Sequence, residues 1–249
     1  PYEIFDDAMR SRAAKRSGLE AKLRAAHADG AFVLHYQPVV DLTNGAITEC
    51  ESLLRWPAGT RGNIAQRAVL EVAEDSGLIV PIGAWAIGSA ARQAALWADA
   101  GGDGRAVAVG VNLSPRQCLH RGTVDVVARA IGELGLDPAL LSFEFTEAAA
   151  MADPDRAGKV LGGLKELGVR LAIDDFGTAH SSLRLLERLP VDAVKIDASF
   201  TRGMTDNRQE AAIVAAVVGL AHAFGLIAIA EGVETIGEVD RLRALDCDA

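Results

Sequence analysis

The chain is poor in several features that mark particular classes of protein. Aromatic side chains make up only 5% of its 249 residues, and its three cysteines, Cys50, Cys118 and Cys247, are odd in number and far apart. Cysteines without a CxxC pair indicate reduced thiols rather than a disulfide framework, so we expect a cytoplasmic setting. No apolar run reaches the roughly 18 residues of a membrane span, and no signal peptide is recognisable. We therefore expect this piece to be soluble and to make no membrane contact.

Positive charge is also scarce. The chain has 25 Lys and Arg residues against 34 Asp and Glu residues, which gives a formal net charge of -9. This balance argues against a broad binding surface for long nucleic acid, although it leaves room for a small phosphate ligand held by metal. Half of the residues are hydrophobic, and α/β barrels of this length commonly form one domain. One main domain with one sizeable core is expected.

Strand and helix patterns alternate along most of the chain. The expected strands lie near 32–41, 47–56, 106–113, 141–147, 170–175, 193–197 and 226–231, and the expected helices near 64–76, 81–100, 121–134, 154–167, 180–188, 207–224 and 235–245. The sequence Thr43-Asn44-Gly45 predicts a hairpin, so the first two strands should be antiparallel. The later strands should be parallel with right-handed crossovers. The predicted fold is α/β, a modified TIM (β/α)8 barrel with an antiparallel first strand and no eighth strand in this chain.

Charged and amide side chains stand near the carboxyl ends of six apolar segments. Such groups at the ends of buried strands are costly unless they are paired or bind metal. Barrel enzymes place their chemistry at this end of the strands, and Mg²⁺ and Mn²⁺ prefer oxygen ligands. The pattern therefore predicts a polyanionic metal site at one end of the barrel, with candidate residues Glu51, Asn112, Glu144, Asp174, Asp175, Lys195, Asp197 and Glu231.

Side-chain alternation predicts which residues point into the barrel, because successive strand residues face opposite sides of a sheet. A bulky set should face the helices: Val109, Val111, Phe143, Phe145, Leu171, Ile173, Val194 and Ile196. A set of small and then polar residues should point inward: Gly110, Asn112, Ser142, Glu144, Ala172, Asp174, Ala193 and Lys195. The polar groups should then gather at the mouth of the barrel.

Two further residues of the mouth need a separate argument. Arg55 shares one strand face with Glu51, which places a guanidinium that can bind phosphate beside a carboxylate. Glu231 has the parity of the apolar Ile227 and Ile229, so it can point inward only if the chain turns at Gly232.

Eight short segments resemble the EAL-type cyclic-di-GMP phosphodiesterases, in the order and spacing of that family from about residue 32 onward. These segments are HYQPVVDLTNGAI, ESLLRW, SGLIVPIGAW, VNLSPRQ, FEFTE, LAIDDFGT, LPVDAVKID and AEGVET. One such match is weak, but eight in register are specific. The resemblance implies a bacterial second-messenger hydrolase that opens cyclic di-GMP to linear pGpG. Two divalent ions, Mg²⁺ or Mn²⁺, would activate a water for in-line attack on the phosphodiester.

The resemblance also implies roles for individual residues. The implied metal ligands are Glu51, Asn112, Glu144 and Asp174 for one ion, with Asp175 and Glu231 for the second ion and the nucleophilic water. Lys195 matches a lysine that holds this water or a metal-bound oxygen, and Asp175 or Glu231 would accept the proton of the water. The implied substrate contacts are Gln37, Leu53, Arg55 and Asp197, and the implied loop-positioning residues are Glu147 and Glu234. Three alternatives stay open: Asp197 as a helix cap, Arg55 as a neutraliser of neighbouring acids, and Lys195 as a buried partner of an aspartate.

Residues 2–29 have helix-like spacing and end before Gly30. They resemble the linker that follows a GGDEF (diguanylate cyclase-like) domain in tandem signalling proteins. A simple N-terminal helix of the barrel is the alternative, because it would show the same helix-like spacing. We therefore expect a linker helix at 1–29 and the barrel domain at 30–249, truncated or disordered at its C-terminus. The chain should be part of a longer polypeptide, which missing segments can tether to a membrane, and a homodimer is implied.

Departures from the family pattern keep a second function open. The signature triplet reads Glu51-Ser52-Leu53 instead of Glu-Ala-Leu, and Ser52 should be tolerated because it lies on the opposite face from Glu51. The segment after Pro57 is atypical. The loop after the fifth strand reads DFGTAHSS where the family has DFGTGYSS, so Ala179 and His180 alter a loop linked to metal binding and dimer contact. The alternative to an active phosphodiesterase is a catalytically impaired sensor of cyclic di-GMP or a protein-interaction module.

Overall fold

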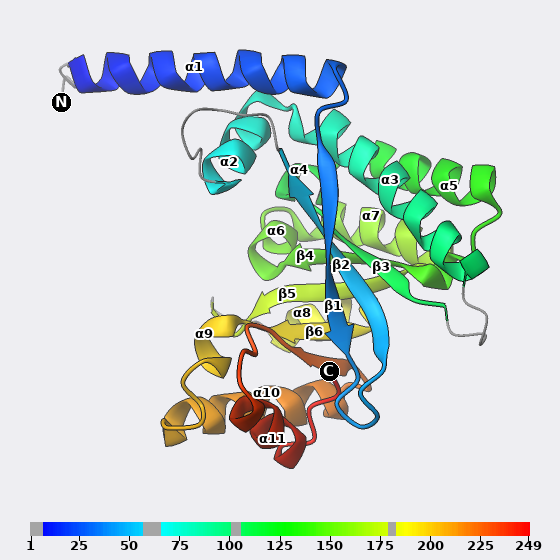
Figure 1. Cartoon of the computed structure of the whole chain (residues 1–249), viewed down its shortest axis with the longest axis vertical. Coiled ribbons are helices and arrows are strands. Elements are labelled where there is room, and N and C mark those ends of the chain that lie inside the picture. Colours follow the sequence, from blue (N-terminus) through cyan, green and yellow to red (C-terminus); the bar gives the residue numbers. More distant parts are fainter. Residues whose placement is uncertain (1–6, 57–65, 101–105, 179–182) are drawn as a thin grey trace.

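The computed structural model describes residues 7–56, 66–100, 106–178 and 183–249. Its strands form one curled sheet in chain order, with helices packed around the outside (Figure 1). The strands are β1 (Val33–Val40), β2 (Ile47–Arg55), β3 (Ala108–Asn112), β4 (Leu141–Thr146), β5 (Arg170–Phe176), β6 (Ala193–Ile196) and β7 (Ile227–Ala230). β1 runs antiparallel to β2, and each later pair is parallel. The predicted α/β barrel with an antiparallel first strand is confirmed.

The hairpin between β1 and β2 is formed by the predicted turn residues. The carboxylate of Asp41 accepts hydrogen bonds from the backbone N–H groups of Thr43 and Asn44, at 2.8 and 3.2 Å. Gly45 follows with a φ of +74°, a conformation that glycine adopts without steric cost. This local turn reverses the chain, and the strand register then pairs Gln37 with Glu51.

The long helices match the predicted ranges, whereas several one-turn helices were not predicted. The long ones are α1 (Asp7–Ala28), α2 (Gln66–Ser76), α3 (Ile79–Ala100), α5 (Gly122–Leu134), α7 (Pro154–Glu166), α10 (Arg208–Ala223) and α11 (Ile236–Ala244). The short ones are α4 (Pro115–Cys118), η1 (Pro138–Leu140), α6 (Glu147–Met151), α8 (Leu183–Arg188) and α9 (Ala198–Thr201), of which only α8 lay in a predicted range. Ser114, Thr146 and Asp197 cap α4, α6 and α9 with their side chains. These caps satisfy backbone donors at the points where strands end.

The main core lies between the outer face of the sheet and the helices. All eight residues of the predicted outward-facing set are buried there, with exposed fractions of 0–3%. Phe143 and Phe145 are the largest of them. A second apolar cluster joins α1 to the barrel through Leu23, Phe32 and Ile82. The prediction from alternation is therefore correct, and it leaves the inner positions to small and polar residues.

The sheet stays open between β7 and β1. Across this gap, the N–H of Leu42 donates to the carbonyl of Asp248 at 2.9 Å, and the N–H of Ala230 donates to the carbonyl of Ala249 at 2.7 Å. The guanidinium of Arg243 also donates to the carbonyl of Leu42, at 2.7 Å. Asp248 and Ala249 thus occupy the position of an eighth strand, beside the strand edges that it would pair with.

Within the described ranges, no helix combines the length and apolar character that a bilayer crossing requires. The three cysteines are free thiols, as the sequence predicted.

Candidate functional site

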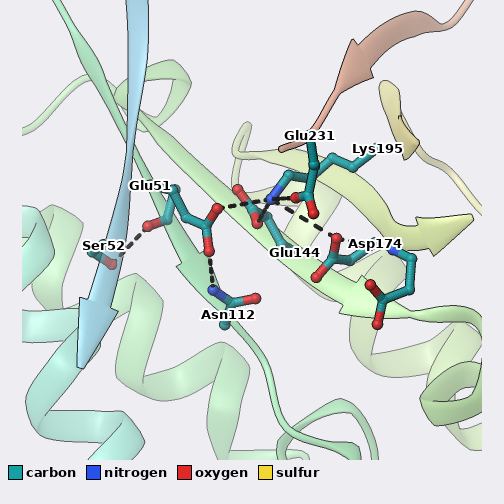
Figure 2. A network of polar contacts seen from close by, with 9 residues as sticks. Glu51, Ser52, Asn112, Glu144, Asp174, Lys195 and Glu231 are labelled. Atoms are coloured by element: carbon teal, nitrogen blue, oxygen red, sulfur yellow. Dashed lines mark hydrogen bonds and ion pairs between the residues drawn. The ribbon is translucent and has the colours of Figure 1, made fainter. Parts of the chain in front are cut away.

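A buried lysine gathers four carboxylates at the carboxyl ends of the strands (Figure 2). The Nζ atom of Lys195 lies 2.9 Å from Glu51 and 2.5 Å from Glu144. It lies 2.6 Å from Glu231 and 3.8 Å from Asp174. The side chains of Lys195 and Glu144 are 2% and 1% exposed. Because these residues come from five different strands or strand ends, only the curvature of the sheet brings them together.

Asn112 joins the same group through Glu51. Its Nδ2 atom donates to Oε1 of Glu51 at 2.7 Å, while the other carboxylate oxygen of Glu51 faces Lys195. The parallel register sets this geometry, because Asn112 pairs with Glu144 and Glu51 pairs with Gly110. The four residues predicted to hold the first ion therefore converge on one rim.

The signature substitution at Ser52 is accommodated on the other face of β2. The hydroxyl of Ser52 donates to the carbonyl of Gly110 at 2.6 Å, and the residue is buried. This contact follows the outward direction predicted for Ser52 and leaves the Glu51 side of the strand unchanged.

Asp174 and Asp175 are neighbours in sequence, so a regular strand would point them to opposite faces. Asp175 instead has a φ of +55°, and the register between β5 and β6 shifts between Ile173 and Phe176. This irregularity turns both carboxylates toward the mouth. One oxygen from each of Asp174, Asp175 and Glu231 lies within 4.8 Å of the others.

Glu231 points inward because the chain leaves the strand geometry after β7. Its N–H donates to the carbonyl of Ile196 at 3.0 Å, and Gly232 follows with a φ of +69°. A Cβ at Gly232 would stand 2.5 Å from Cβ of Ala198. The turn predicted at Gly232 is therefore present, and it requires glycine both for its dihedral and for the space.

Burial and charge act in opposite directions on the ionisable groups of this cluster. Burial raises the pKa of Glu144 to about 8 and that of Glu231 to about 7, although Lys195 lowers both. Burial lowers the pKa of Lys195, but the carboxylates of Glu144, Asp174, Glu231 and Glu51 outweigh it, so the net shift is upward. Lys195 is therefore a permanent ammonium ion at neutral pH.

The outer acids form a second, more exposed pair. Burial raises the pKa of Asp175, and the nearby charges of Asp174 and Asp197 raise it further. Asp197 behaves differently, because hydrogen bonds from Ser199 lower the pKa of its carboxyl group. Its Oδ1 accepts from the N–H of Ser199 at 2.9 Å and caps α9, which is the capping role that the sequence left open.

A cavity of about 620 Å³ opens beside the cluster. Glu51, Asp174, Lys195 and Glu231 line it on one side, and Gln37 and Leu53 line it from the first two strands. Sequence reasoning missed two arginines in its lining, Arg202 and Arg243, which lie on or beside helices with no strand-end signal. The cavity has the size of a small-molecule site.

Arg55, Glu147 and Glu234 were also predicted to belong to the site, but they do not line this cavity. Arg55 donates to the carbonyl of Leu54 at 3.0 Å. Glu147 is buried at the start of α6, and Glu234 is exposed and lies 3.7 Å from Arg202. Ala179, His180 and the segment 57–65 lie outside the described residues, so the loop that Glu147 was predicted to position is not described.

Sequence reasoning also missed a charge inside the barrel. Glu49 is 7% exposed and pairs with Arg170 at 3.0 Å. Burial raises the pKa of Glu49, and Arg170 and Lys195 lower it. A signal was present, because Glu49 lies two residues before Glu51 and must share its strand face.

The donors of the cluster fit a hard divalent cation. Carboxylate oxygens from Asp174, Asp175 and Glu231 are already grouped, and Glu51, Asn112 and Glu144 add carboxylate and amide oxygens around Lys195. Sulfur and imidazole ligands do not appear in this donor set. Such all-oxygen sets are typical of Mg²⁺ and Mn²⁺ sites.

Comparison with known proteins gives a consistent result. The sequence model of the EAL domain family matches residues 20–249. The chain is 41% identical over 248 residues to the "Bifunctional diguanylate cyclase/cyclic di-GMP phosphodiesterase MucR" of Pseudomonas aeruginosa, covering 100% of this chain and 36% of that protein. It is 38% identical over 246 residues to an "Uncharacterized signaling protein" of Caulobacter vibrioides, covering 99% of this chain and 30% of that protein. The chain thus spans about a third of the length of these curated relatives.

The fold also matches a solved structure described as "PaMucR Phosphodiesterase, c-di-GMP complex". The TM-score is 0.86 and the sequence identity 42%, over 93% of each chain.

Proposed function

Because the chain belongs to the EAL domain family, we propose that it is a phosphodiesterase that opens cyclic di-GMP to linear pGpG with the help of Mg²⁺ or Mn²⁺. The family includes a relative that is named a cyclic di-GMP phosphodiesterase. The name of the MucR relative supports this substrate, as does the structure of its complex with c-di-GMP.

One observation carries the proposal. Oxygen-bearing side chains from separate strands converge around a single lysine at the wall of a cavity of about 620 Å³. So much negative charge in a buried place is costly for folding, and its position beside a cavity supports a role in binding cations and a phosphate ligand.

In this proposal, Glu51, Asn112, Glu144 and Asp174 hold one divalent ion, and Asp175 and Glu231 hold a second. When bound, the ions supply charge stabilisation for the phosphodiester and lower the pKa of a water. The side chains themselves fix the direction of attack, because five strand ends determine where each oxygen stands.

Lys195 and the two outer acids handle the water and its proton. Lys195 stays protonated, so its ammonium group can orient the water or a phosphate oxygen but cannot act as the base. Glu231 and Asp175 both have raised pKa values, and that of Glu231 lies at about 7. Either Glu231 or Asp175 is proposed to accept the proton of the water.

Substrate contacts are proposed for four residues. Gln37 and Leu53 line the cavity next to Glu51. Arg55 would contribute its guanidinium to a phosphate, and Asp197 would add a contact beside the cap that it forms for α9. Glu147 and Glu234 are proposed to position the loops that follow β5 and β7.

The setting of the domain is also a proposal. We infer that α1 is the linker from a preceding GGDEF-like domain, that residues 30–249 are the EAL-type barrel, and that it acts in the bacterial cytoplasm as a homodimer. The bifunctional name of the MucR relative, of which this chain spans 36%, supports the tandem arrangement.

The test is turnover by the purified protein. With Mg²⁺ or Mn²⁺ present, cyclic di-GMP should be converted to pGpG, and Glu51→Ala should reduce the product below detection because it removes a ligand and the partner of Asn112. Glu71→Ala, on an exposed face of α2, is the control and should retain activity. Tight binding of cyclic di-GMP without turnover under either ion would contradict the enzymatic proposal and favour the sensor.

A further inference from the structure

An ion pair lies inside the barrel, one layer below the carboxylate cluster. Oε2 of Glu49 on β2 is 3.0 Å from the guanidinium of Arg170 on β5, and the hydroxyl of Ser142 on β4 hydrogen-bonds to the same carboxylate. The side chain of Glu49 is 9% exposed and that of Arg170 is 35% exposed. The layer is continuous in register, because Ser142 pairs with Gly110 on one side and with Arg170 on the other.

Gly110 brings this layer into contact with the site above it. A Cβ at Gly110 would stand 2.6 Å from Oε1 of Glu144 and 2.7 Å from Oε1 of Glu49. Both carboxylates therefore fill the space that a side chain at Gly110 would take. Glu144 in turn contacts Lys195 at 2.5 Å. Oε1 of Glu144 and Oε1 of Glu49 are the two atoms nearest to that Cβ position.

We propose that Glu49 is a charge-balancing residue, which neutralises Arg170 beneath the site and thereby preserves the affinity of Glu51 and Glu144 for a divalent cation. This inference rests on the proposed metal-dependent function. It adds to that function a residue, Glu49, that is not one of the proposed metal ligands. Glu49 acts through its neighbours, so it is a positioning residue and not a catalytic one.

The physical reason is electrostatic: a positive charge that is not balanced beneath the rim repels a cation bound at the rim. Arg170 places a positive charge inside the barrel, where the carboxylate of Glu49 pairs with it and also approaches Glu144 at Gly110. An unbalanced unit charge several ångströms from a divalent ion weakens its binding, and even with the dielectric screening of water the change in affinity is about tenfold. Glu49→Gln keeps the shape and a hydrogen-bond acceptor but leaves Arg170 unbalanced. Removing Arg170 as well restores the balance.

The experiment measures Mn²⁺ binding by calorimetry in the absence of substrate. Glu49→Gln should raise the Kd for Mn²⁺ about tenfold relative to the wild type. Glu49→Gln/Arg170→Gln should return it to within about twofold of the wild type, and Arg170→Gln alone should bind Mn²⁺ at least as tightly as the wild type. These opposite effects are the distinguishing readout, because a purely structural role of the pair would weaken binding in all three variants.

A matched control lies between α7 and the residue that precedes β6. Lys165 and Asp192 form a part-buried ion pair at 2.6 Å, and Asp192 also accepts from the N–H of Leu171, next to Arg170. Asp192→Asn should lower the unfolding temperature and leave the Kd for Mn²⁺ unchanged.

Three results would overturn the inference. They are an unchanged Kd in Glu49→Gln, a double variant that stays as weak as the single one, and weaker binding by Arg170→Gln alone. If the wild type itself binds no Mn²⁺, the proposed metal dependence fails, and the inference fails with it. A failure of this inference is thus distinguishable from a failure of the proposed metal dependence, because the three results above can be obtained only if the wild type binds Mn²⁺.

Discussion

Among single residues, Lys195 does most to make the acidic rim compatible with folding. It is almost fully buried and touches Glu51, Glu144 and Glu231 within 2.9 Å. Carboxylates this close together repel one another, and burial adds a desolvation cost to each. The ammonium group offsets both costs in the metal-free protein, since it contacts all three carboxylates. Lys195 therefore supplies positive charge at the place where the proposed divalent ions would bind.

We expect Lys195→Met to destabilise the metal-free protein by about 3–5 kcal/mol, the usual cost of leaving buried charges without their partner. Added Mn²⁺ should recover part of this loss, because cations then compensate the same carboxylates. The measurement is urea unfolding in a chelator and again in saturating Mn²⁺. Lys165→Met, which removes a lysine from a more exposed pair, is the control and should be insensitive to Mn²⁺. An equal loss for Lys195→Met in both conditions would contradict the counter-ion role.

At the scale of elements, the exits of the strands decide which side chains reach the rim. β3 and β4 run regularly to their ends, and Asn112 and Glu144 follow the ordinary alternation. β5 and β7 depart from it: Asp175 has a positive φ, and Glu231 is turned inward before Gly232. Both departures bring a carboxylate to the mouth that a regular strand would direct elsewhere.

Gly232→Ala tests the exit of β7. The added Cβ meets Ala198 at 2.5 Å in a backbone conformation that L residues rarely adopt, so Glu231 should shift. We expect a loss of about 1–3 kcal/mol in stability and about 100-fold in kcat, since small displacements of reacting groups are costly. Steady-state kinetics and thermal unfolding measure the two effects.

Gly225→Ala is the matched control for this change. Gly225 has a similar φ of +71°, lies at the opposite end of β7 and has no atom within 4 Å of an added Cβ. It should lose stability and keep its kcat. Equal kcat values for the two variants would contradict the importance of the turn at Gly232.

At the scale of the whole molecule, the concentration of acid at one rim should make stability depend on pH. The folded-state pKa values of Glu144 and Glu231 are raised to about 8 and about 7, above those of an unfolded chain. The folded state then binds more protons than the unfolded state between the ordinary carboxyl range and about pH 8. Metal-free stability should therefore fall as pH rises through this window. The stabilisation from Lys195 stays constant there, because its raised pKa keeps it protonated throughout.

We expect the unfolding temperature in a chelator to be lower at pH 8 than at pH 5.5, by roughly 2–4 °C for each kcal/mol lost. Mn²⁺ should stabilise the protein more at pH 8, because its ligands must be deprotonated. Thermal unfolding across this range, with and without Mn²⁺, makes the measurement. Glu144→Gln cannot ionise and should give a flatter profile. A metal-free unfolding temperature that rises with pH would contradict the assignment of the buried carboxylates.

Much of the architecture could be predicted because it depends on local patterns. The alternation of residues such as Phe143 and Glu144 identifies a strand and its two faces, and Asp41 with Gly45 encodes a hairpin within five residues. The one-turn helices were missed for the opposite reason: α4, α6 and α9 are too short to show a helical period, and only their capping residues mark them.

The sequence by itself determined the order of the strands, their inward faces and the acidic residues at their ends, since strand geometry and side-chain alternation are properties of neighbouring residues. The tertiary structure alone decided which charges meet. Lys195 and Glu51 are separated by 144 residues, and Glu49 finds Arg170 only across the curled sheet. Such pairings depend on the curvature and stagger of the strands, which no short stretch of sequence encodes.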